Sequence, residues 1–144
     1  ARRLGQSPLH SPSVFNFYRP GYVPPGTPIA NKVGVVAPEF QITTESSVAG
    51  YLNFMQSAIS ATVGILGSDV VPNYEAWLPL ATDSPALVAQ ANLLFAAGGL
   101  SPATVATITS AVASMTSGTE AQRRSRVHAT LLLTMAAPEY LVQQ

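Results

Sequence analysis

The distribution of proline constrains the fold of this chain more than any other feature. Of its twelve prolines, seven lie within the first 40 residues. These are Pro8, Pro12, Pro20, Pro24, Pro25, Pro28 and Pro38. Each proline fixes its own φ angle, lacks an amide hydrogen and disfavours helical backbone in the residue before it. No long helix fits such a segment, so we predict an extended arm over residues 1–42 and a helical domain over residues 43–144.

The arm is too apolar for an ordinary disordered tail. It contains six large apolar or aromatic side chains within ten residues: Val14, Phe15, Phe17, Tyr18, Tyr22 and Val23. Segments that stay disordered usually have few such residues, because burial of apolar surface is what offsets the entropy of ordering a chain. We therefore expect an ordered arm without regular secondary structure. The surface it covers is either its own helices or another part of a longer protein.

From Thr43 onward, apolar residues recur every three or four positions, the period of a helix with one buried face. A first helix is predicted to begin at Thr43 or Thr44, either of which can cap its first turn, and to end near Gly64 or Gly67. Its apolar stripe is Val48, Leu52, Met55, Ile59, Val63 and Leu66. Residues 68–82 show no clear period and are predicted to form a loop with a short helical turn.

The second helix has strong boundary signals. It should begin at Asp83 or Ser84, with Pro85 in the first turn, where a missing N–H costs nothing. It should end at Gly98 and Gly99, because a left-handed helix cap favours glycine. Its predicted stripe is Leu87, Val88, Ala91, Leu94 and Phe95.

The next two helices have boundary signals of the same kind. The third is predicted to begin with Ser101 and Pro102 and to stop at Gly118, and the fourth to run from Thr119 towards Pro138. The third carries the stripe Val105, Ile108, Val112 and Met115. The fold class is therefore all-α, with about four helices in an irregular bundle after the arm.

Composition excludes several classes of function. The chain has seven basic and seven acidic residues and no long run of one sign, whereas nucleic-acid binders usually carry a basic stripe. It contains no cysteine, which excludes disulfides and thiolate chemistry. The longest strongly apolar run, residues 131–137, is far shorter than the roughly 20 residues of a membrane-spanning helix, so no transmembrane segment is predicted.

No catalytic motif, metal site or cofactor site is recognisable. His10 and His128 stand alone, so no metal and no cofactor are predicted, and enzymatic activity stays open. The cluster 122–126, "QRRSR", places Arg123 and Arg126 on one helix face and is expected to be solvated or to form salt bridges.

Candidate ligand or interface residues come from the arm: Phe15, Phe17, Tyr18, Arg19, Tyr22, Glu39 and His10. Aromatic rings beside an arginine suit a cleft, but packing of the arm against the helices is the favoured explanation for them.

Three phrases of the sequence resemble one protein family. They are "LGQSPLHSPSVFNFYRPGYVPPGTPIA", "APEFQITTESSVAGYLNFM" and "RVHATLLLTMAAPEYLVQQ". They are similar to the C-terminal portion of bacterial proteins in the domain-of-unknown-function family numbered 1800. The residues matching the family phrases are Ser13, Phe15, Asn16, Tyr18, Arg19, Pro20, Glu39 and Glu139. Residues 68–118 match least.

The resemblance implies a longer, mostly helical bacterial protein, often with an export signal, and a periplasmic or secreted location. Its members have no known activity and no accepted catalytic residues. The resemblance also implies that the chain is a C-terminal fragment, and because it starts at Ala1 without methionine, a natural, a processed and a truncated start all stay open. The expected partner of the arm is the missing N-terminal region or another protein chain, and the oligomeric state is open.

Three function hypotheses follow. The first is a non-catalytic structural or protein-interaction module. The second is the C-terminal part of an enzyme whose active site lies mainly in a missing region, with His10, Arg19 or Glu39 contributing. The third is binding of a small ligand or peptide by the aromatic residues of the arm.

Overall fold

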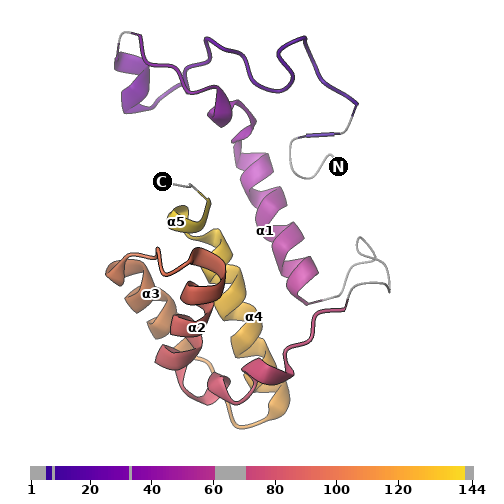
Figure 1. Ribbon diagram of the computed structural model, residues 1–144, viewed down its shortest axis with the longest axis vertical. Coiled ribbons are helices and arrows are strands. Elements are labelled where there is room, and N and C mark those ends of the chain that lie inside the picture. Colours follow the sequence, from indigo (N-terminus) through magenta and orange to yellow (C-terminus); the bar gives the residue numbers. More distant parts are fainter. Residues whose placement is uncertain (1–5, 8, 33, 61–70, 142–144) are drawn as a thin grey trace. The chain divides into compact units, whose positions relative to one another are not determined.

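The structure is a computed structural model that describes residues 6–7, 9–32, 34–60 and 71–141 (Figure 1). All regular secondary structure in these ranges is helical, which confirms the all-α prediction. The chain forms two compact units, Ala1–Phe54 and Met55–Gln144. No helix within the described ranges combines the length and the apolar character that crossing a membrane requires.

The first unit consists mainly of irregular backbone folded back on itself. It contains two short 3-10 helices, η2 (Pro28–Asn31) and η3 (Pro38–Ile42). The amide of Ala37 donates to the carbonyl of Tyr22 at 2.8 Å, and the amide of Arg19 donates to Oε1 of Gln41 at 2.6 Å. These bonds hold the segment 19–22 beside the segment 37–41.

Helix α1 (Glu45–Ile59) begins in the first unit and ends in the second. Thr44 and Ser47 form a reciprocal cap, because each side-chain oxygen accepts the amide of the other residue, at 3.2 and 2.8 Å. This confirms the predicted helix start. The predicted exits at Gly64 and Gly67, together with Val63 and Leu66, lie outside the described residues.

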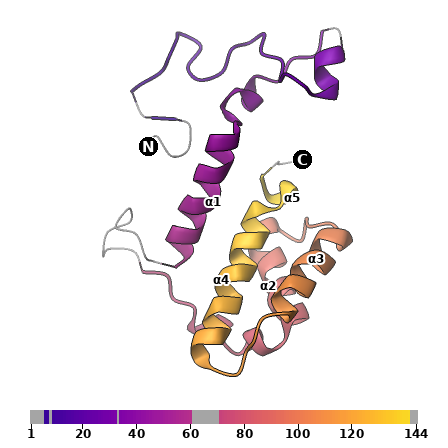
Figure 2. The ribbon, with the colours of Figure 1, turned by 180° about the vertical axis from the view of Figure 1, so that it is seen from behind.

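The second unit is built on α2 (Ser84–Ala96), α3 (Pro102–Ala113) and α4 (Glu120–Ala136), followed by the single turn α5 (Pro138–Leu141). Figures 1 and 2 show α2, α3 and α4 side by side. Two 3-10 turns, η5 (Glu75–Trp77) and η6 (Leu80–Thr82), precede α2. The core residues with the least exposure are Ala81, Leu87, Val88, Ala91, Val112, Val127 and Leu131.

The predicted N-terminal caps of this unit agree with the structure, whereas the predicted ends of α2 and α3 do not: α2 ends with Ala97 as its left-handed cap, and α3 ends at Ala113 instead of Gly118. Asp83 accepts the amide of Ala86, and Ser101 accepts the amide of Thr104. Thr119 and Gln122 form a full capping box at the start of α4, which satisfies two amides that the helix cannot. Because N-terminal caps depend on a few neighbouring residues, they are readable from the sequence.

Two predicted stripes were wrong in part. Val48 and Leu52 of α1 are 48% and 36% exposed, and of the stripe residues that the structure describes only Ile59 is buried. On α2, Leu94 is 59% exposed and Phe95 37% exposed. The fully buried residues of α2 end at Ala91; beyond it Ala96 packs against the core while partly exposed, and Leu100 in the connection after the helix is buried.

The difference in burial between Leu87 and Leu94 can be tested by the same substitution at both positions of α2. Leu87→Ala should lower the free energy of unfolding by about 2–5 kcal/mol, because Leu87 is fully buried and its loss leaves a cavity. Leu94→Ala, the same chemical change two turns later, should change it by no more than about 0.5 kcal/mol. Chemical denaturation of both variants checks this, and equal losses would contradict the placement of the core.

Candidate functional site

The predicted arm residues lie within one unit but do not form a cluster around a shared group. Phe15 is 55% exposed, whereas Phe17, Tyr18 and Tyr22 are half-buried. The side chains of His10, Arg19 and Glu39 are exposed. Among the described residues, these three share no recorded hydrogen bond or ion pair, and no group of three metal-ligating side chains occurs.

A tight turn presents Phe15 to solvent. The amide of Asn16 donates to the carbonyl of Ser13 at 3.0 Å, and the amide of Phe15 donates to Oγ of Ser13 at 3.2 Å. Asn16 has a φ of 60°, a left-handed conformation that asparagine adopts more readily than most residues. The turn is closed by local bonds, so the exposure of Val14 and Phe15 follows from its geometry. Beyond the turn, the hydroxyl of Tyr18 accepts a hydrogen bond from Nε2 of Gln6.

Arg126 of α4 is the most unusual side chain of the second unit. It is only 5% exposed, and its recorded hydrogen bonds all go to backbone carbonyls. Nη1 donates to Ala81 at 2.7 Å, Nε to Val112 at 3.1 Å and Nη2 to Ala113 at 3.3 Å. The prediction of a solvated or ion-paired arginine face was therefore wrong for Arg126, because the carbonyls ending α3 and within η6 provide its partners.

Glu139 of α5 joins the start of α3. Its Oε1 accepts the hydroxyl of Thr104 at 2.7 Å and the amide of Ser101 at 3.2 Å. These hydrogen bonds, with that of Thr104 the strongest, lower the pKa of Glu139 from 4.5 to about 2. A carboxylate at this position also complements the positive end of the α3 dipole.

His128 lies against Tyr74 rather than standing alone. The ring centroids are 5.1 Å apart at an interplanar angle of 64°, an edge-to-face arrangement. The hydroxyl of Tyr74 donates to the carbonyl of Ile59 at 2.8 Å, so the pair ties the end of α1 to α4. Burial, and secondarily the charge of Arg124, lower the pKa of His128, so the neutral imidazole is favoured.

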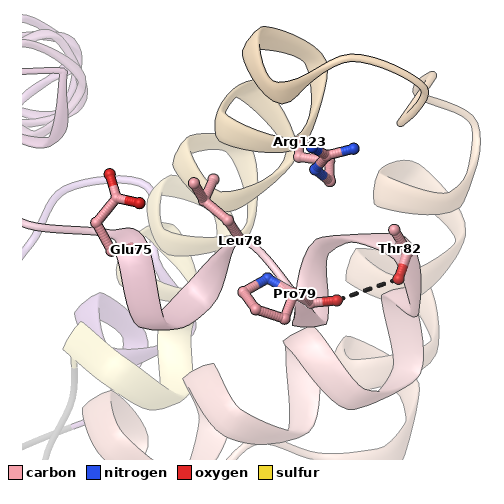
Figure 3. Close-up of a pocket in the computed structure, with 5 residues that line it drawn as sticks. All are labelled: Glu75, Leu78, Pro79, Thr82 and Arg123. Carbon is pink, nitrogen blue, oxygen red and sulfur yellow. Dashed lines mark hydrogen bonds between the residues drawn. The ribbon is translucent and has the colours of Figure 1, made fainter.

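An open depression of about 380 Å³ lies between η5, η6 and α4 (Figure 3). It is lined by Glu75, Leu78, Pro79, Thr82 and Arg123. Beside it, Nη2 of Arg124 contacts Glu75 at 3.3 Å and Glu120 at 3.2 Å. The hydroxyl of Thr82 donates to the carbonyl of Pro79 at 3.1 Å, which fixes the shape of one wall.

The family model described as "Protein of unknown function (DUF1800)" matches residues 1–142. The chain belongs to the DUF1800 family. This confirms the resemblance carried by the three sequence phrases. No curated protein matches the chain, and neither does any solved structure.

Sequence reasoning missed the roles of Arg126 and Glu139 in this DUF1800 chain, because both residues lie in patterns that have an ordinary explanation. Arg126 lies in a charged cluster that looks like a solvated helix face, although Val127 beside it is fully buried. Glu139 sits in the phrase "APEY", where proline followed by glutamate is ordinary chemistry for a helix start. The phrase "APEF" at residues 37–40 is similar, yet Glu39 is exposed.

Replacing Arg126 should strongly destabilise the second unit. Arg126→Met keeps much of the side-chain volume but leaves the carbonyls of Ala81 and Ala113 without their donor and removes one donor from the carbonyl of Val112, which the amide of Met115 also contacts, at 3.1 Å; the loss should cost roughly 3 kcal/mol. Arg123→Met, three residues earlier and less buried, serves as the control and should cost less than about 1 kcal/mol. Urea denaturation measures both, and a loss below 1 kcal/mol for Arg126→Met would show that these bonds contribute little.

The Glu139 network predicts a dependence of stability on acid. Because folding lowers this pKa, ionised Glu139 stabilises the fold above pH 4.5, and the contribution is lost as the pH falls towards about 2. Glu139→Gln should therefore flatten the fall of the unfolding midpoint over this window. Glu39→Gln removes one carboxylate elsewhere and controls for net charge. A pH profile identical for Glu139→Gln and the unaltered protein would exclude the network as its cause.

Proposed function

We propose that this DUF1800 chain is a non-catalytic protein-interaction module of an exported bacterial protein, and that its arm is the docking surface. The supporting observation is the exposure of apolar side chains in the arm. Val14 is 94% exposed and Phe15 55% exposed. Among the described residues of the first unit, only Pro24 and Ala37 are buried. Export and bacterial origin rest on the family resemblance.

The energetics favour an interaction role over a purely internal one. A fully buried valine or phenylalanine side chain stabilises a structure by about 1.5–3 kcal/mol relative to its exposed state. At Val14 and Phe15 this stabilisation is not realised within the chain. It becomes available when a partner covers the turn at residues 13–16.

The chemistry of the arm defines the partner. Residues 9–31 carry a single full charge, on Arg19, so electrostatic recognition of a polyanion has little to act on. The arm instead suits an apolar groove on a folded protein, in which the turn at residues 13–16 is the first contact and Phe17, Tyr18, Tyr22, His10, Arg19 and Glu39 are further candidate contacts. That groove belongs either to another region of the same protein or to a second protein chain.

The two alternatives, an enzyme contribution and ligand binding by the arm, have less support than the interaction module. An enzyme contribution from His10, Arg19 and Glu39 requires these groups to converge, and they share no recorded contact within the described residues. Ligand binding by the arm aromatics requires a cavity lined by those rings. The depression of Figure 3 is lined by Glu75, Leu78, Pro79, Thr82 and Arg123 and includes none of these rings.

Site-specific photocrosslinking in the native cell tests the proposal. A benzophenone amino acid at Phe15 should give one discrete adduct, whereas the same group at the exposed position Thr107 of α3 should give none. With the photoreactive group moved to Phe17, Val14→Ser together with Phe15→Ser should abolish the adduct without changing the thermal midpoint. Peptide mapping separates the two sources of partner. Equal adducts at Phe15 and Thr107, or none at Phe15, would refute a docking role for the arm.

A further inference from the structure

Two neighbouring arginines of α4 differ in how their charges are used. Both nearby carboxylates, Glu75 and Glu120, contact Arg124. The recorded hydrogen bond of Arg123 runs from Nη1 to the carbonyl of Gly118 at 3.5 Å, near the outer limit for such a bond. Within the described residues, Arg123 has no recorded ion pair. Most donors of its guanidinium are therefore available to a ligand.

Arg123 borders the depression described above, and the other walls supply apolar surface. Figure 3 shows Arg123 and Glu75 at opposite sides of Leu78 and Pro79. Leu78 is buried, whereas Glu75, Pro79 and Thr82 are exposed. The depression thus offers a cation at one side, a carboxylate at the other and an apolar floor between them.

We propose that this depression binds a short acidic segment of a partner protein. Arg123 pairs with the carboxylate of an aspartate or glutamate side chain, and a flanking apolar residue contacts Leu78 and Pro79. The planar guanidinium matches a carboxylate because two parallel N–H donors can reach its two oxygens. Glu75 lies where the backbone amides of the bound segment can donate to it.

The same geometry selects among ligands. The exposed walls enclose little of a small molecule, whereas small-molecule sites bury most of the ligand surface. A peptide segment held by a larger protein gains further contacts outside the depression.

This proposal is independent of the docking role of the arm. The depression belongs to the unit Met55–Gln144 and shares no residue with the arm. Loss of crosslinking at Phe15 would leave it unaffected, and failure of peptide binding would leave the arm proposal standing.

Trp77 is the only tryptophan of the chain and provides the readout, because it lies in η5 between Glu75 and Leu78. The full chain is titrated with the blocked tripeptide acetyl-leucyl-glutamyl-leucine amide, and Trp77 fluorescence is followed. We expect saturable binding that is at least about fivefold weaker for the glutamine analogue of the peptide. Arg123→Gln should weaken binding of the acidic peptide about tenfold, as loss of a charge-assisted bidentate contact does. Lys32→Gln removes one positive charge at an exposed position of the arm and should leave binding unchanged.

Thermal melting of each variant separates lost binding from lost folding. Arg123→Lys, which keeps the charge but not the two-pronged geometry, should give intermediate affinity and serves as a second test if Arg123→Gln is unstable. Equal binding of the two peptides, absence of saturable binding, or binding unaffected by both substitutions of Arg123 would overturn the proposal. Tighter binding of inorganic phosphate than of the acidic peptide would overturn it in favour of a general anion site.

Discussion

A buried guanidinium without a carboxylate partner needs backbone acceptors, and at Arg126 these come from two other elements of the helical unit. The carbonyls of Val112 and Ala113 belong to the last turn of α3, which carries partial negative charge, and the carbonyl of Val112 accepts the amide of Met115 at 3.1 Å as well. The carbonyl of Ala81 belongs to η6, directly before the Asp83 cap of α2. One side chain thus fixes the end of α3, the entry to α2 and the rotation of α4 about its axis.

The rotation of α4 determines what the rest of that helix can do. With Arg126 turned inward, Arg124 and His128 share another face, since they are four residues apart. Tyr74 and Glu75, which are consecutive in the sequence, contact that face: Tyr74 packs on His128, and Glu75 forms an ion pair with Arg124. The η5 turn is therefore held along α4 by one ionic and one aromatic contact. The depression beside Arg123 is a consequence of the same arrangement.

The sequence predicted the local features of this fold and missed those that depend on distant residues. The starts of α2, α3 and α4 follow from Asp83, Ser101 and Thr119, each of which acts on an amide three residues away. The end of α3 at Ala113 rather than Gly118 coincides with carbonyl contacts from Arg126, 13 and 14 residues further along the chain. The exposure of Leu94 likewise depends on how far neighbouring elements cover α2. Periodicity defines a helix face but not the length of it that is covered.

The two units differ in how they satisfy polar and apolar groups. In the helical unit, one helix buries both kinds of side chain: on α4, Leu131 belongs to the apolar core, and Arg126 is buried with backbone carbonyls as its hydrogen-bond partners. In the arm, local turns satisfy backbone groups while Val14 and Phe15 stay exposed. Proline lowers the entropy that such a segment loses on ordering, so the turn can persist with little core of its own. The exposed side chains of Val14 and Phe15 therefore contribute little to the stability of the fold, and their burial would stabilise a complex with a partner.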